Sequence, residues 1–267
     1  MLQPTDNKKF EFYKFRRNGK IVDDSPVCGL TLKAAGSMRF RWNEKNERRD
    51  LVLNPLGTIV PLQLDHTHIV YNVKEAGDTK GKIGDGIITK NELLVPSVTV
   101  ADCMPVYLYD SETGVFGIVH SGWKGTGIAV DAIKLAQKEY GARAENFLVI
   151  LGPHIRECCY IVSQERADYF SKNFTPECIK PLESGVEVSW NTGSGALYRL
   201  SLEKANLAAL KKAGVPDENI WIHPACTCCT QKDNTFIYGS NRRETTVAGQ
   251  PDKFTVQAAF ICCKFDD

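Results

Sequence analysis

Two reactive side chains, Cys103 and His120, stand at the ends of short apolar runs in the middle of the sequence. Residues 98–108 are rich in β-branched and aromatic types and predict a buried strand, as do residues 115–119, while residues 110–114 (DSETG) are dense in turn formers. If the two strands pair as a hairpin across that turn, the thiol and the imidazole lie at similar distances from it and can face each other. A thiol beside an imidazole can share a metal ion or act as a nucleophile with its base.

Both residue types also have ordinary structural roles, because cysteine is often a small buried hydrophobe and a histidine at a strand end is often just a hydrogen-bonded polar group. The neighbouring residues favour a functional site. Asp102 directly precedes the thiol, and Gly122, Gly125 and Gly127 follow the histidine. Glycines there allow backbone N–H groups to approach a ligand, and a helix beginning near Thr126 would direct its positive end to the same place.

The elements that must hold these residues are both helices and strands. Apolar spacing predicts a helix over 126–140, which Gly141 ends, and a second helix over 201–213, which ends before Gly214. Apolar runs bounded by turn formers predict further strands at 51–73 (with a polar interruption at 63–68), 86–89, 147–151, 220–222 and 254–260, and residues 1–50 suggest edge strands and loops. Since no repeat, low-complexity segment or linker separates these elements, we expect one α+β domain.

The composition is that of an ordinary globular protein. The chain has 267 residues, of which 43% are hydrophobic and 24% charged, and its formal net charge is +1. This balance does not indicate nucleic-acid binding, and no apolar run reaches the length of a membrane-spanning helix. The N-terminal residues 1–20 lack the apolar core of a secretory signal, so we expect a cytoplasmic protein with neither nucleic acid nor membrane as partner. The sequence leaves the oligomeric state open.

The sequence contains ten cysteines, a high number, and without a secretory signal we expect them to be reduced. Adjacent cysteines such as Cys158 and Cys159 rarely form a disulfide with each other. Cys226-x-x-Cys229 has the spacing of half a zinc ribbon or of a redox pair, but no second such motif follows it. A structural role is therefore favoured for this motif, and the roles of Cys226, Cys228 and Cys229 stay open.

Six short segments, in order along the chain, carry these residues in recognisable motifs. They are 63–70 (QLDHTHIV), 101–105 (ADCMP), 120–125 (HSGWKG), 152–160 (GPHIRECCY), 226–227 (CT) and 240–244 (SNRRE). They resemble the segments Q-x-H-[GS]-x-x-V, A-D-C-x-P, H-A-G-W-R-G, G-P-x-I-x-x-C-C-Y-E-V, C-T and S-Y-R-R-D of the laccase-domain, or YfiH-like, family. Members of that family are variously described as polyphenol oxidases, peptidoglycan-editing factors and purine nucleoside phosphorylases. Six motifs in one order are hard to obtain by chance.

The resemblance implies an α-β-β-α sandwich in which residues 1–267 form a single domain and residues 1–50 are a divergent N-terminal part of it. It also implies a zinc site with His, Cys and His as ligands, and the last two match Cys103 and His120 directly. The first ligand depends on register, because counting from the glutamine of the first segment gives Asp65, whereas counting back from its H-[ST]-x-x-V pattern gives His66. We prefer His66, since imidazole with thiolate suits zinc.

The activity that the resemblance implies is zinc-dependent phosphorolysis of purine nucleosides (adenosine, inosine and methylthioadenosine), together with deamination of adenosine. Zinc with three protein ligands keeps a position open for water or substrate, so these ligands are also the expected catalytic residues. The partners would be a small nucleoside and phosphate, bound by residues near the metal: Tyr160, Lys124, Arg242 and Arg243. Lys124 stands where the family usually has arginine and keeps the charge without the bidentate fork, and Ile161 stands where the family usually has glutamate.

The same residues are also compatible with other functions. Cys103 could be the nucleophile of a cysteine hydrolase with His120 as its base, which would include a peptidoglycan-editing role. A non-enzymatic protein could present the Trp123 loop to a partner and would turn over no nucleoside. A blue multicopper laccase is excluded by arithmetic, because its copper centres need many more imidazoles than the five histidines of this chain.

Overall fold

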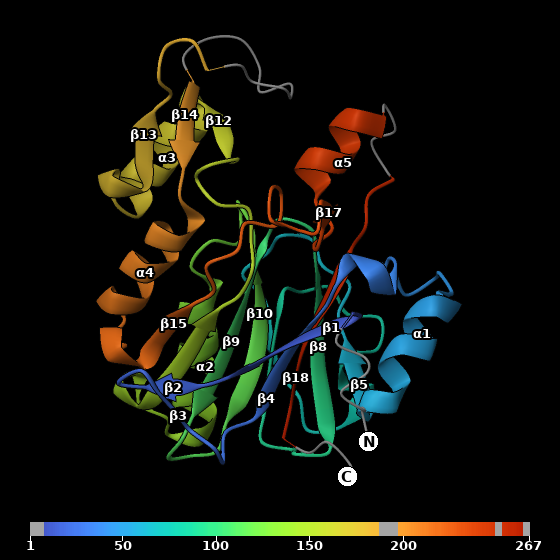
Figure 1. Ribbon diagram of the computed structural model, residues 1–267. Coiled ribbons are helices and arrows are strands. Elements are labelled where there is room, and N and C mark those ends of the chain that lie inside the picture. Colours follow the sequence, from blue (N-terminus) through green and yellow to red (C-terminus); the bar gives the residue numbers. More distant parts are fainter. Residues whose placement is uncertain (1–7, 187–196, 249–252, 264–267) are drawn as a thin grey trace.

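Two β-sheets pack face to face in the computed structural model, which describes residues 8–186, 197–248 and 253–263 (Figure 1). The five-stranded sheet has the strand order β1 (Phe10–Lys14), β4 (Val27–Thr31), β18 (Gln257–Cys262), β8 (Leu94–Val100) and β5 (Thr58–Pro61). The six-stranded sheet has the order β15 (Ile220–Ile222), β11 (Phe147–Leu151), β9 (Met104–Asp110), β10 (Phe116–Ser121), β7 (Gly86–Thr89) and β6 (Val70–Asn72). The helices are α1 (Glu47–Leu53), α2 (Ile128–Tyr140), α3 (Gln164–Asn173), α4 (Leu202–Lys212) and α5 (Asn241–Ala248).

Alternate residues of the central strands pack into two different cores. Tyr107 of β9 points toward the five-stranded sheet and contacts a core that includes Leu30 and Ile261, while its neighbour Val106 points the other way, into the core shared with Ile133 of α2. The outer face of the five-stranded sheet packs against α1 through a third core. Strands buried on both faces are apolar along their whole length, which explains their uninterrupted hydrophobic runs. The predicted α-β-β-α sandwich is confirmed.

The predicted hairpin is present, but its first strand is shorter than expected. β9 and β10 pair antiparallel, with His120 opposite Pro105. Residues 98–100, however, belong to β8 of the other sheet, and residues 101–103 cross from one sheet to the other. Asp102 has a backbone φ of 81°, which breaks the strand at this point. Cys103 therefore lies at the start of β9 and beside the end of β10, at one edge of the six-stranded sheet.

Both predicted helices are confirmed, within one or two residues of the expected ends. The α2 helix begins at Ile128 and ends at Gly141, whose φ of 68° is the left-handed conformation that glycine adopts readily. The α4 helix begins after Ser201, whose side chain accepts a hydrogen bond from the Lys204 N–H. None of the described helices is both long and apolar enough to cross a lipid bilayer.

Residues 51–53 are helical, which differs from the strand predicted over 51–73. They form the last part of α1, whose N-terminal end is capped by the side chain of Asn46 accepting from the Arg49 N–H. Leu51 is exposed and Leu53 is buried, whereas in a strand these two side chains would lie on the same face. The polar residues before this run, and not its own composition, determine the local structure.

Residues 161–200 contribute elements that the sequence did not predict. The strands β12 (Ile161–Ser163), β14 (Leu197–Leu200) and β13 (Ile179–Pro181) form a small sheet, and α3 lies against it at the top of Figure 1. Two further strand pairs, β2 (Arg16–Arg17) with β3 (Lys20–Ile21) and β16 (Gln231–Lys232) with β17 (Thr235–Phe236), are two residues long in each strand.

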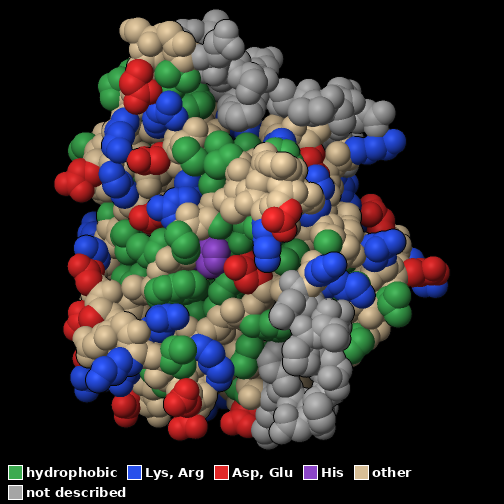
Figure 2. Space-filling model, viewed as in Figure 1, with side chains coloured by type: hydrophobic (Ala, Val, Ile, Leu, Met, Phe, Trp, Pro, Cys, Tyr) green, Lys and Arg blue, Asp and Glu red, His purple; other side chains and the backbone are tan. Residues whose placement is uncertain are grey.

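Figure 2 shows Lys and Arg side chains interspersed with Asp and Glu over the face in view.

Candidate functional site

The thiol of Cys103 and the imidazoles of His66 and His120 converge on one point. Sγ of Cys103 and one ring nitrogen of each histidine all lie within 4.8 Å of one another. Sγ is 3.9 Å from Nε2 of His66, and the centroids of the two imidazoles are 4.9 Å apart. The three residues come from the β8–β9 crossing, the β5–β6 loop and the end of β10. The structure thus brings together the three residues that the sequence analysis proposed as metal ligands.

Asp85, at the end of the loop before β7, holds both histidines in place. Its buried carboxylate accepts a hydrogen bond from Nδ1 of His120 at 2.8 Å, from the backbone N–H of His66 at 3.1 Å and from that of Thr67 at 2.6 Å. The bond to Nδ1 leaves Nε2 of His120 as the nitrogen available to a metal ion. A carboxylate that orients a histidine ligand in this way is a usual second layer around protein metal sites.

A glycine makes room for the converging side chains. A Cβ at Gly122 would lie 2.7 Å from Sγ of Cys103 and 3.0 Å from Cδ2 of His66. Any larger residue would displace the sulfur or the imidazole. This close approach, rather than an unusual backbone conformation, is the physical reason for glycine directly after His120 and Ser121.

The electrostatics of the group favour a thiolate. Burial would raise the pKa of Cys103, but the neighbouring imidazole of His120 outweighs it and lowers this pKa to about 6. For His120 the effects are reversed. Burial alone would lower its pKa, but the Cys103 sulfur and the Asp85 carboxylate outweigh burial and raise this pKa to about 10. Thiolate is the form of cysteine that binds metal ions and attacks electrophiles. Between about pH 6 and pH 10, these pKa values favour a thiolate beside an imidazolium in the metal-free protein.

Asp102, the residue before Cys103, binds two distant segments through three donors. Its buried carboxylate accepts from Oγ1 of Thr227 at 2.7 Å, from Oγ of Ser240 at 2.9 Å and from the backbone N–H of Arg242 at 2.6 Å. Burial raises the pKa of Asp102, although each of these hydrogen bonds acts to lower it. The motifs around 226–227 and 240–244 therefore meet the Ala-Asp-Cys motif through this one carboxylate.

The metal-ligand group opens into a pocket of about 570 Å³ with several cationic side chains. Ligand pockets in proteins measure roughly 300–1,000 Å³. The apolar lining residues include Leu64, Ile155 and Val256, and the positively charged lining residues are Arg39, Arg41, Lys124, Arg166 and Arg242. Asp65 lies at the surface of the same pocket, and Asp102 is engaged by its donors. The pocket thus combines apolar surface with an excess of positive charge.

Tyr160 and Arg166 form one wall of this pocket, and the sequence indicated only the first of them. The Arg166 guanidinium carbon lies 3.8 Å from the centroid of the Trp123 ring, and its NH1 donates to the Tyr160 hydroxyl at 3.3 Å. Arg166 lies on α3, a helix with only Ala167 and Phe170 buried, and its motif context gave no signal.

The two adjacent arginines of the 240–244 motif point in different directions. Arg242 lines the pocket, with its guanidinium carbon 5.4 Å from the Tyr160 centroid and NH1 donating to the carbonyl of Ile161 at 2.9 Å. Arg243 is buried and donates to the carbonyls of Cys228 and Tyr238, both at 2.6 Å. Arg243 thus braces backbone segments, which differs from the substrate-binding role expected from the sequence. The reason is that the helix α5 directs successive side chains to different sides.

The alternative ligand Asp65 and the nearby His68 lie apart from the converging group. Asp65 lines the pocket, but its carboxylate is not among the atoms that converge with the Cys103 sulfur. His68 hydrogen-bonds Asp131 at 2.7 Å and the carbonyl of Lys124 at 3.1 Å. His66 itself has a φ of 56°, a left-handed conformation that bends the chain between the two histidines.

Two nitrogens and one sulfur in this arrangement suit a transition metal such as zinc, copper or iron. His120 is buried and oriented by a carboxylate, while Cys103 and His66 face the pocket, which gives access to water or substrate.

Comparison with known proteins finds a matching family, relatives in sequence and a neighbour in structure. A family model described as multi-copper polyphenol oxidoreductase laccase matches residues 40–256. The purine nucleoside phosphorylase YlmD of Geobacillus stearothermophilus is 31% identical over 62% of this chain and 57% of its own length, and the adenosine deaminase RL5 of an unknown prokaryotic organism is 31% identical over 59% and 56%. The chain thus spans little more than half the length of either relative. The crystal structure of the hypothetical protein YfiH of Bacillus licheniformis superposes with a TM-score of 0.74 at 24% identity, over 90% of this chain and 93% of that one.

Proposed function

From the premise that this chain belongs to the multi-copper polyphenol oxidoreductase laccase family, we propose that it is a zinc-dependent purine nucleoside phosphorylase that also deaminates adenosine. The observation that carries the proposal is the opening of the His66–Cys103–His120 group into a pocket lined by five cationic side chains. Such a pocket suits a neutral base and sugar together with an inorganic anion.

Copper oxidase chemistry is not part of the proposal, despite the family's description. All five histidines lie in the described residues, and only His66 and His120 belong to a metal-ligand group. His154 is buried with Nδ1 on the carbonyl of Gly152, and His223 pairs with Glu11. These positions cannot supply the imidazoles of a multicopper centre.

His66, Cys103 and His120 would hold the zinc ion, and Asp85 would orient His120 and the backbone at His66. A zinc ion held there would supply Lewis-acid chemistry to the bound substrate.

Phosphate binding falls to the cationic side chains. In phosphorolysis a phosphate oxygen forms a bond to C1′ of the ribose while the bond from C1′ to the purine nitrogen breaks, which releases the base and ribose 1-phosphate. Arg242 and Arg166 can hold the phosphate by charge-assisted hydrogen bonds, and Lys124 adds a third positive charge on the same pocket. The apolar side chains that line the pocket, such as Ile155, can pack against the purine base.

The direct test is to incubate the purified protein with adenosine, with and without phosphate, and to follow the products by chromatography. We expect adenine and ribose 1-phosphate only when phosphate is present, and inosine in either case. The His66→Ala variant should lose both activities, whereas His68→Gln, a change of the neighbouring histidine outside the group, should keep them. Wild-type protein that forms none of these products from adenosine or inosine would refute the proposal.

A cysteine hydrolase is the second candidate, favoured by one specific observation. The Asp85 carboxylate hydrogen-bonds the His120 imidazole, which in turn lies close to the Cys103 thiol, as in a catalytic triad. The pKa of Cys103 is lowered to about 6. These are the features of an activated cysteine nucleophile. In that case chelating agents would leave activity intact and rapid alkylation of Cys103 would abolish it.

A further inference from the structure

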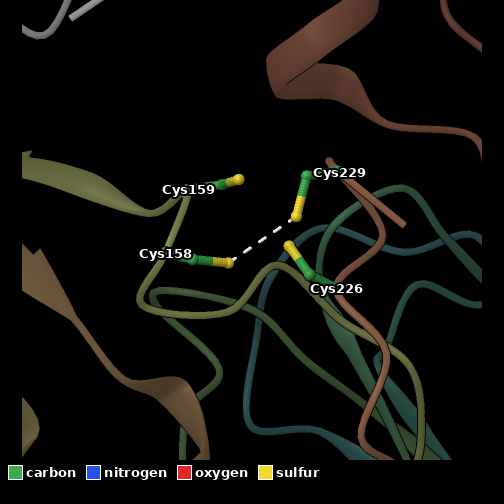
Figure 3. Close-up of side chains that lie close together, drawn as sticks. All are labelled: Cys158, Cys159, Cys226 and Cys229. Carbon is green, nitrogen blue, oxygen red and sulfur yellow. Dashed lines mark hydrogen bonds between the residues drawn. The ribbon is translucent and has the colours of Figure 1, made fainter. Parts of the chain in front are cut away.

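Four cysteine thiols outside the pocket converge on a second point. Cys158 and Cys159 follow β11, and Cys226 and Cys229 follow β15, so the two pairs come from different parts of the chain. Figure 3 shows their sulfurs directed into the space between the two segments. All four Sγ atoms lie within 4.8 Å of one another, and those of Cys158 and Cys229 are 3.7 Å apart.

These distances are close to those of a metal ion with four sulfur ligands. Sulfurs bonded to a tetrahedral zinc ion at roughly 2.3 Å are separated from one another by about 3.8 Å. All four are free thiols in the structure, and two of them, Cys159 and Cys226, are buried. Cys226-x-x-Cys229 is only half of a zinc motif, and the other half, two adjacent cysteines, lies more than sixty residues earlier in the sequence (226 − 159 = 67).

The backbone around the cluster is already arranged to support thiolate ligands. The N–H of Arg156 donates to Sγ of Cys226 at 3.4 Å, and a β-bridge joins His154 to Cys226. Hydrogen bonds of this kind orient and stabilise the sulfur ligands of metal sites. The two segments are therefore held in register even before any ion joins them.

Positive charge stands next to the cluster as well. The guanidinium of Arg199 donates to the carbonyl of Cys158 at 3.1 Å, and that of Arg243 donates to the carbonyl of Cys228 at 2.6 Å. Four thiolates with one divalent ion carry a net charge of about −2, which nearby guanidinium groups stabilise. The buried Arg243 contacts the loop that carries Cys226 and Cys229, and it also pairs with Glu244 at 2.9 Å.

We propose that Cys158, Cys159, Cys226 and Cys229 bind a zinc ion in a closed four-cysteine site that is separate from the His66–Cys103–His120 group. With four protein ligands no position is left for water or substrate, so the ion is structural. It fastens together two segments that shape the pocket. One continues into Tyr160, which lines the pocket, and the other carries Thr227, which donates to Asp102.

The test is to count zinc in full-length protein purified under reducing conditions, by elemental mass spectrometry. The double variant Cys158→Ser/Cys229→Ser removes two exposed ligands with little loss of packing. Relative to wild type it should lose about one zinc ion per chain and unfold at a lower temperature. Cys228→Ser, in the same loop but outside the group, should keep the wild-type zinc content. Cys103→Ser should keep the ion of the four-cysteine site, so the two sites are counted separately.

Cobalt substitution keeps the proposal testable if the double variant does not fold. Cobalt(II) bound by four thiolates absorbs strongly in the near ultraviolet through sulfur-to-metal charge transfer. In a Cys103→Ser background, which removes the sulfur ligand of the His66–Cys103–His120 group, the change Cys229→Ser should lower this absorption by about a quarter, as one thiolate in four is lost. An unchanged zinc content in the folded double variant, or a disulfide between Cys158 and Cys229 in freshly purified protein, would overturn the proposal.

Discussion

Asp85 connects both histidines of the metal-ligand group, although neither histidine motif contains it. The sequence could predict Cys103 and His120, because each adjoins an apolar run and stands near a carboxylate or glycines. It could not predict Asp85, because a single carboxylate in a polar loop has no local pattern. Its hydrogen bonds to His66 and His120 exist only once β7 has paired with β10.

Asp85→Asn tests this role, because it keeps the size of the side chain and removes its charge. A neutral amide orients the His120 imidazole less firmly than the carboxylate does. It also no longer raises the basicity of the imidazole nitrogen that would bind the metal. We expect the zinc affinity of the group to fall by about 10–100-fold, measured by competition with a chromophoric chelator. Asp131→Asn, which changes the surface partner of His68, is the matched control and should leave the affinity unaltered. Equal affinities in both variants would contradict the role.

The pH dependence of alkylation reports on Cys103 itself. Only the thiolate reacts with iodoacetamide, and it forms as the pH rises through the pKa of the group. In chelator-treated protein we expect the labelling rate of Cys103, followed by peptide mass spectrometry, to rise with a midpoint near pH 6, since its pKa is lowered to about 6. Bound zinc should protect the sulfur at every pH. A midpoint above pH 8 would show that His120 does not stabilise the thiolate.

At the scale of elements, the crossing from β8 to β9 was the part that the sequence did not indicate. Residues 98–108 are apolar almost throughout, so a single strand was the natural interpretation. The break at Asp102 depends on a positive φ and on donors from Thr227 and Ser240, more than a hundred residues away (227 − 102 = 125). The helix α3 was missed for a different reason, since few of its residues face the core.

Thr227→Val tests whether the crossing depends on its distant donors. The change preserves the shape of the side chain but leaves the buried carboxylate of Asp102 without one hydrogen bond. We expect the free energy of unfolding to fall by about 1–3 kcal/mol, measured by chemical denaturation. Thr58→Val, at an exposed strand position, should change it by less than about 0.5 kcal/mol. A Thr227→Val protein as stable as its control would mean that Asp102 does not need this donor.

At the scale of the whole molecule, the layers could be predicted but the pocket could not. Alternating helices and strands together with the family resemblance indicated the sandwich. The cationic pocket, by contrast, draws Arg39, Lys124, Arg166 and Arg242 from four separate parts of the chain. Arg166 reaches it only because the small sheet formed by β12, β14 and β13 positions α3, and strands as short as these leave little trace in the sequence.

The measurement that bears most directly on the proposed enzyme is zinc content and adenosine phosphorolysis in one preparation of Cys103→Ser. If the thiolate of Cys103 is a zinc ligand, both should fall together, the zinc by about one ion per chain, relative to Cys178→Ser as a control at a buried cysteine outside both clusters. Loss of turnover with unaltered zinc would indicate a cysteine nucleophile instead. A Cys103→Ser protein with full zinc content and full phosphorolysis would contradict both functions and leave Cys103 as a packing residue.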